Sequence, residues 1–296
     1  METLSVLVNL SIASGGSAAL IQCGAPEKLC RLLNLDQPDE VINNALWTVC
    51  NISSERDEFA LTLIERGVFF HVCQYMAELF DDDAVEVHEN VRALLLQVVS
   101  QFLQVEPPLR YSVTAPIVPQ LASALRYFSS MSDQEQALTD TLWSLLSVFN
   151  AQSEGVRFED LLSGGASSLL TAALELLPRS SATCRPALLI AIEVAGLGGE
   201  TLERVFTPFV LAHLRQLAIV INQFEGNLLN DLLSLLSVLT SDAPEMVFRV
   251  LESNVLQRLM QPLPALQRGG DASGGLWLMV TELSWVLLNV VTTSAQ

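Results

Sequence analysis

The sequence has 296 residues, of which 50% are hydrophobic and 6% aromatic, and its 33 acidic and 15 basic side chains give a net charge of −18. A chain rich in Leu, Ala and Val with few Gly and Pro favours helices, and so acidic a surface disfavours nucleic acid and anionic membranes as partners. The charge predicts basic partners, or else it serves only to keep an apolar protein soluble. The best candidate for a membrane span, LWLMVTELSWVLLNVV, contains Glu282, so we expect no membrane-spanning segment.

A similar apolar segment recurs from one end of the chain to the other. Two copies, NNALWTVCNISS and TELSWVLLNVVTT, place Asn four residues after Trp, at Trp47 and Asn51 and again at Trp285 and Asn289. Aligning the related segments gives one anchor position in each, at intervals of about 42 to 52 residues. The anchors are Asn9, Asn51, Val99, Ser147, Glu193, Ser237 and Asn289.

A turn signal and a second apolar run follow each anchor but the last. Gly and Asn tolerate the left-handed conformation that ends a helix, and Pro is suited to a first helical turn. The turn residues are Gly24, Gly67, Pro116, Gly165, Pro208 and Asn254. We therefore predict that each unit is a short helix, a tight turn, a longer helix, a loop and the helix that carries the anchor.

The pattern of an apolar residue, two others, Gly, Ala and a further apolar run, followed by Ala-Leu-Trp-x-Val-x-Asn-Ile, resembles armadillo repeats. The Trp-x-x-x-Asn form resembles the importin-alpha family of nuclear import adaptors. The resemblance implies an all-α, right-handed superhelical solenoid of armadillo-type three-helix repeats. Residues 1–296 would form one solenoid of about six repeats. Both ends fall inside repeats and lack clear polar caps, so we expect either a fragment of a longer protein or a partner that covers the ends.

The anchor helices line a concave groove in armadillo arrays, and the chemistry of Trp47 and Asn51 suits an extended peptide there. Residues four apart share a helix face. The Asn amide can bind peptide N–H and C=O groups, and the indole can stack on Lys or Arg side chains. Glu55 is the candidate carboxylate for basic side chains, a role that the resemblance supports. The alternative is that Trp lies in the core and Asn bridges adjacent units.

The other anchor helices match this pattern less well. Trp285 and Asn289 form a second candidate pair. Asn9 follows Ser5 instead of Trp, and Trp143 precedes Ser147 instead of Asn, so each is half of a candidate site. Val99, Glu193 and Ser237 follow Leu95, Leu189 and Leu233, and these units have neither half. The two intact pairs are too far apart for one short basic peptide, but they suit the two halves of a bipartite one.

Three further residue sets bear on chemistry. The histidines His71, His88 and His213 fall in different units and in no catalytic motif, so we expect neither an enzyme nor a cofactor. The five cysteines form no CxxC pair and are expected to be reduced, buried and intracellular. An acidic cluster is either a solvated helix start or a patch for a basic partner. It comprises Glu78, Asp81, Asp82, Asp83, Glu86 and Glu89.

These observations predict an importin-alpha-like adaptor. It would bind the basic, Lys- and Arg-rich nuclear localisation signals of protein cargo in an extended conformation, with an importin-beta-like protein as a further partner. Its location would be the cytoplasm and the nucleus. The alternative is an armadillo scaffold for protein–protein interaction without a transport role. A third class, the regulatory subunit of an enzyme, needs a catalytic partner of which the sequence gives no sign.

Overall fold

The structure is a computed structural model, and its described residues are helical apart from turns and short connections. It describes residues 2–81, 89–129, 131, 134–150, 181–196, 226–242, 244–252, 254–260 and 274–294. The chain divides into two compact units, Met1–Ala166 and Ser167–Gln296, called unit 1 and unit 2 below. No described helix is both long and apolar enough to cross a bilayer.

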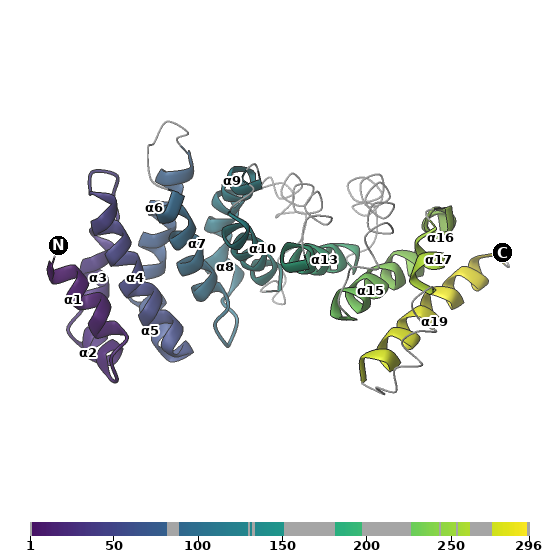
Figure 1. The fold of residues 1–296 in the computed structure, drawn as a ribbon, viewed down its shortest axis with the longest axis horizontal. Coiled ribbons are helices and arrows are strands. Elements are labelled where there is room, and N and C mark those ends of the chain that lie inside the picture. Colours follow the sequence, from purple (N-terminus) through teal and green to yellow (C-terminus); the bar gives the residue numbers. More distant parts are fainter. Residues whose placement is uncertain are drawn as a thin grey trace. The chain divides into compact units, whose positions relative to one another are not determined.

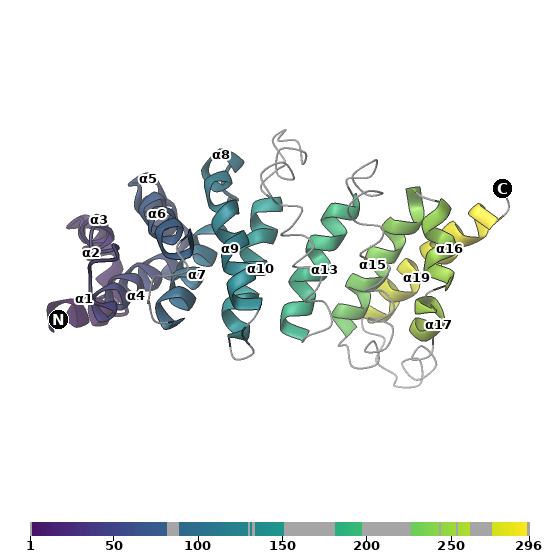
Figure 2. The same ribbon diagram turned by 90° about the horizontal axis from the view of Figure 1, so that it is seen from above.

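The anchor helices of unit 1 stack side by side (Figures 1 and 2). They are α1 (Glu2–Ser11), α4 (Asp39–Glu55), α7 (Glu89–Leu103) and α10 (Glu135–Asn150). α1 packs on α4, α4 on α7, and α7 on α10. Each contains the anchor predicted for it, so the repeat spacing read from the sequence is confirmed in this unit.

Shorter helices precede each of the last three anchor helices of unit 1: two before α4 and α7, and two α-helices joined by a 3-10 turn before α10. They are α2 (Gly16–Gln22) and α3 (Ala25–Cys30), α5 (Asp57–Glu65) and α6 (Val68–Asp81), then α8 (Tyr111–Thr114), η1 (Ala115–Ile117) and α9 (Val118–Ser129). α2 packs on α5, and α6 packs on both α3 and α9. The three-helix repeat is thus confirmed. The second helix is the longer one in the later repeats, but α2 and α3 have 7 and 6 residues, so that detail is wrong for the first.

The predicted turn residues have the conformations that their chemistry favours. Gly24, Gly67 and Asn254 have φ angles of 68°, 80° and 59°, the left-handed region that Gly adopts without cost and Asn tolerates. Pro116 lies in the first turn of η1. Gly165 and Pro208 lie outside the described residues. The four turns that can be examined are therefore confirmed.

Unit 2 repeats the same stacking over its described helices. They are α13 (Ser181–Gly196), α15 (Gly226–Asp242), α16 (Pro244–Glu252), α17 (Val255–Met260) and α19 (Gly274–Ser294). α13 packs on α15 and α15 on α19, while α16 contacts α15, α17 and α19. The remaining anchors, Glu193, Ser237 and Asn289, lie on α13, α15 and α19.

Apolar faces of the stacked helices form the core. Leu46 on α4, Leu95 on α7 and Leu142 on α10 are fully buried. Burying such a leucine side chain contributes about 1.5–3 kcal/mol. The opposite faces of α4, α7 and α10 carry polar side chains such as Asn43, Gln97 and Asp140, and this asymmetry positions the groove described next.

Candidate functional site

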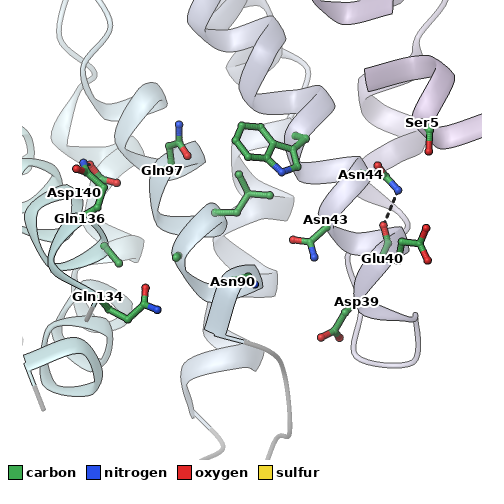
Figure 3. A pocket seen from close by; sticks show the side chains of 14 residues that line it. Ser5, Asp39, Glu40, Asn43, Asn44, Asn90, Gln97, Gln134, Gln136 and Asp140 are labelled. Atoms are coloured by element: carbon green, nitrogen blue, oxygen red, sulfur yellow. Dashed lines mark hydrogen bonds between the residues drawn. The ribbon is translucent and has the colours of Figure 1, made fainter. Parts of the chain in front are cut away.

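A groove of about 850 Å³ crosses the anchor helices of unit 1 (Figure 3). We call it the unit 1 groove. It is lined by Ser5 of α1; Asp39, Glu40, Asn43, Asn44 and Trp47 of α4; Asn90, Ala93, Leu94 and Gln97 of α7; and Gln134, Gln136, Ala137 and Asp140 of α10 and the residue before it. All four anchor helices of the unit therefore contribute to one surface.

Helical periodicity explains why these side chains share the groove. On α4, Glu40, Asn43 or Asn44, and Trp47 follow one another at intervals of one turn, and residues three or four apart share a face. Leu46 and Val49 on the other face are fully buried. With the apolar face held in the core, Trp47 keeps 43% of its surface exposed, although it is a large hydrophobic side chain.

Amide and carboxylate groups dominate the groove. Its amides belong to Asn43, Asn44, Asn90, Gln97, Gln134 and Gln136, and its carboxylates to Asp39, Glu40 and Asp140. The described lining residues include no Lys, Arg or His. Such a surface offers hydrogen bonds of both kinds to a main chain, negative charge to cations, and one indole for stacking.

Asp140 is a half-buried carboxylate of the groove. Burial raises the pKa of its carboxyl above the ordinary value, and a hydrogen bond from Gln136 partly offsets this. The Gln136 Nε2 atom donates to Asp140 Oδ1 at 2.9 Å. A half-buried carboxylate gains more from a cationic ligand than an exposed one, because water screens the attraction less.

Of the predicted site residues, only Trp47 lines the unit 1 groove. Asn51 lies one turn beyond it on α4 and is half-buried, whereas Glu55 is exposed at the end of the helix. Neither is among the lining residues.

Asn51 makes a hydrogen bond between adjacent repeats. Its Nδ2 atom donates to Ser11 Oγ at 2.9 Å. Ser11 Oγ donates its single proton to the carbonyl oxygen of Val8 at 2.6 Å, so it can only accept from Asn51. This fixes the orientation of the amide and ties α4 to the end of α1.

Asn289 makes the equivalent bridge in unit 2. Its Nδ2 atom donates to Thr240 Oγ1 at 3.2 Å and lies 3.4 Å from the carbonyl oxygen of Ser237. Thr240 Oγ1 in turn donates to the carbonyl oxygen of Leu236 at 2.8 Å. The bridging role that the sequence left as an alternative is therefore present at both Asn residues. The neighbouring Trp285 is 54% exposed.

The two half-sites also lie outside the lining of the groove. Asn9 is exposed on α1. Trp143 is half-buried on α10, and one turn later Ser147 Oγ donates to the Trp143 carbonyl oxygen at 3.0 Å. The structure thus brings Trp47, but not Asn9 or Trp143, into the groove.

In two anchor helices the observed burial differs from the predicted positions equivalent to Trp and Asn. In α7, Leu95 and Val99 are both fully buried, so they belong to the core. The half-buried residues one turn apart on the open face are Gln97 and Gln101. A pair of amides therefore takes the place of Trp and Asn in this repeat.

In α15 burial moves the position equivalent to Trp by one residue. Leu233 is 1% exposed, whereas Ser234, the anchor Ser237 and Val238 are half-buried. The sequence alignment followed the apolar run LLSLLSVL, in which Leu occurs on both sides of the open face. The sequence signal for the open face is the set of polar residues that recur every turn, which includes Ser234 in α15 and Gln97 and Gln101 in α7.

Three carboxylates of the groove were also missed. Asp39 and Glu40 occupy the first turn of α4, where acidic residues are common because they stabilise the helix dipole. Asp140 has no distinctive sequence context. Of the acidic cluster, Glu78 is exposed on α6, while 82–88 lie outside the described residues.

The structure adds little to the chemistry of the other predicted groups. His71 is exposed on α6, and His88 and His213 lie outside the described residues. No three His, Cys, Asp or Glu side chains of the described part could hold a metal ion. Cys30, Cys50 and Cys184 are buried and Cys73 is half-buried, but Cys23 is exposed, so the expectation that all five are buried is wrong.

Comparison with known proteins identifies the fold. The model of the armadillo/beta-catenin-like repeat matches residues 14–54, which are α2, α3 and α4. No curated protein sequence matches the chain. The family model confirms the predicted all-α armadillo fold for residues 14–54, and similar solved structures confirm it for the rest of the chain.

Several solved structures are similar to most of the chain. An engineered protein superposes with a TM-score of 0.70 at 13% identity, over 98% of this chain and 64% of its own length. A computationally designed armadillo repeat protein for modular peptide recognition gives 0.66 at 15% identity, over 88% and 98%. A designed armadillo repeat protein in complex with the peptide (KR)4 gives 0.63 at 16% identity, over 89% and 98%.

Proposed function

Because the chain is an armadillo-repeat solenoid, we propose that it is a peptide-binding scaffold, and not an enzyme, whose unit 1 groove holds a basic protein segment in an extended conformation. The observation that carries this proposal is the lining of the groove. Amides, three carboxylates and the exposed Trp47 meet there, and no cation lies among the described lining residues.

An extended peptide has the groups that this lining can satisfy. Its main-chain N–H and C=O groups have no partners of their own, and Asn and Gln side chains both donate and accept. Its basic side chains gain charge-assisted hydrogen bonds from the carboxylates, each contributing about 1.5–3 kcal/mol. The net charge of −18 adds a long-range attraction that speeds association. A designed armadillo repeat protein of similar fold was solved with the peptide (KR)4, which supports the same ligand class here.

Recognition of nuclear localisation signals is the narrower form of this proposal. It is supported by the Trp47–Asn51 pair and by the basic ligand that the groove favours. Under it, the protein would act in the cytoplasm and the nucleus on protein cargo, together with an importin-beta-like partner. A general scaffold without a transport role is the alternative, favoured by the presence of one indole, that of Trp47, among the described lining residues. Nuclear accumulation of a fluorescent cargo that requires this protein would distinguish the transport role from the scaffold.

The proposal is tested by titrating fluorescein-labelled (KR)4 with the protein and following fluorescence anisotropy. We expect a dissociation constant in the micromolar range or below at low salt, and weaker binding as salt rises. The double variant Glu40→Gln, Asp140→Asn should bind at least about tenfold more weakly, the equivalent of about 1.4 kcal/mol.

A matched control separates groove contacts from general charge. Asp57 and Glu58 are exposed in the first turn of α5 and do not line the groove. The variant Asp57→Asn, Glu58→Gln also removes two negative charges, but away from the groove, so its affinity should stay near that of the wild type. No saturable binding of (KR)4 at low salt, or equal losses in the two variants, would refute the proposal.

The indole is tested in the same assay. Trp47→Ala removes a stacking surface worth about 0.5–2 kcal/mol to a cation, so affinity should fall roughly 2- to 30-fold. Phe70 on α6 is 60% exposed and does not line the groove, which makes Phe70→Ala the matched aromatic control. Trp285→Ala then reports whether unit 2 contributes, as a bipartite ligand would require.

A further inference from the structure

We propose that the part of the unit 1 groove between Trp47 and Gln97 selects arginine over lysine in the bound peptide. This inference rests on the proposed function and names the ligand side chain that the site prefers. It starts from the corrected register of α7, in which Gln97 takes the position that Trp47 has on α4.

A ligand side chain that enters between α4 and α7 meets two different walls. The helices pack on each other, and both residues line the groove. On one side lies the indole of Trp47, which is 43% exposed. On the other side lies the side-chain amide of Gln97, labelled in Figure 3, which forms no hydrogen bond to any residue that the structure describes.

One indole and one amide suit lysine poorly. The lysine stem is a flexible chain of four methylene groups, which is best covered by apolar surface on both sides. Gln97 supplies a hydrated amide where a second indole would cover the stem. The ammonium group is also compact and strongly hydrated, so it loses more hydration when it is held in a narrow groove.

Arginine matches the same two walls. Its planar guanidinium can lie on the Trp47 indole with one face, and its five N–H donors then point outward in the plane of the group. The side-chain amide of Gln97, on the facing wall, can accept from one of these donors. Asp140, on the next anchor helix along the groove (Figure 3), offers a carboxylate to a further basic side chain of the peptide: its Oδ1 accepts from Gln136, and no described residue donates to its Oδ2.

The test compares two fluorescein-labelled peptides of equal length and charge, octa-arginine and octalysine, by anisotropy at one salt concentration. We expect octa-arginine to bind about tenfold more tightly or better. Gln97→Trp rebuilds the second apolar wall, so it should strengthen octalysine binding and bring the two affinities together. Gln97→Leu removes the amide acceptor and adds a smaller apolar surface, so it should weaken octa-arginine binding and strengthen octalysine binding less than Gln97→Trp does.

Controls keep the outcomes distinct. Gln74 is exposed on α6 and does not line the groove, so Gln74→Trp should leave the ratio of affinities unchanged. Equal binding of the two peptides by the wild type would overturn this inference and leave the proposed function standing. Unchanged ratios in both Gln97 variants would overturn the role of Gln97. Absence of binding by either peptide would overturn both proposals.

Discussion

Replacing Asn51 by alanine removes the hydrogen bond that ties α4 to the end of α1. The bond is 2.9 Å long, and its acceptor, Ser11, is 2% exposed. A hydrogen bond of this kind contributes about 0.5–1.5 kcal/mol to stability. α1 packs mainly on α4 and α2, so the loss should appear as easier local opening of α1 before it affects the rest of the chain.

Native-state amide hydrogen exchange measures that opening directly. For a loss of about 1 kcal/mol, amides of α1 should exchange about fivefold faster in Asn51→Ala than in the wild type, with little change in α6 or α9. Asn44→Ala is the matched control, because Asn44 lies on the same helix and donates only to the Glu40 carbonyl oxygen of that helix. Its α1 amides should exchange at the wild-type rate.

A double-mutant cycle with Ser11→Ala assigns the effect to the bridge itself. If Asn51 acts through Ser11, the double variant should be less destabilised than the sum of the two single variants, with a coupling of about 0.5–1.5 kcal/mol. Additive effects, or unchanged exchange of α1 in Asn51→Ala, would refute the bridging role. An Asn51 variant that binds peptide more weakly should therefore be compared with variants whose α1 amides exchange at the same rate.

Two further predictions follow from buried titratable groups. Burial raises the pKa of the Asp140 carboxyl, so the folded state favours its protonated form, and the free energy of unfolding falls as pH rises through that pKa. The urea midpoint of Asp140→Asn should therefore be higher than that of the wild type at pH 7 and equal to it at acid pH, although the variant should bind (KR)4 more weakly. A lower urea midpoint at pH 7 would contradict this. Native protein should show one fast-reacting thiol, Cys23, with Ellman's reagent at pH 8, because burial raises the pKa of Cys30, Cys73 and Cys184 to about 12 and that of Cys50 to about 11. Rapid reaction of two or more thiols would show that the buried set is accessible.

The repeat and its turns could be predicted from sequence because each depends on local chemistry. Gly24 and Gly67 adopt positive φ angles, and few other residues do so cheaply. The anchors recur because every repeat must bury the same face of its third helix. Periodicity alone was enough to place all seven anchors on the helices that carry them.

The open face of those helices was harder to predict. In the run VRALLLQVVSQF, apolar residues surround Gln97 and Gln101, and only the packing of α7 between α4 and α10 shows which of them face outward. The pairing of Asn51 with Ser11 joins residues 40 positions apart, and it depends on how neighbouring repeats stack. Asp39 and Asp140 meet in one groove only through the same stacking.

Photo-crosslinking of (KR)4 tests the central claim, that the unit 1 groove is the binding surface, most directly. A peptide with a benzophenone at one end would be irradiated with the protein, and the modified residues would be identified by mass spectrometry. We predict crosslinks within 39–47, 90–97 and 134–140, lost when unlabelled (KR)4 is added in excess. Competed crosslinks confined to α6 and α9, or to unit 2, would contradict the account.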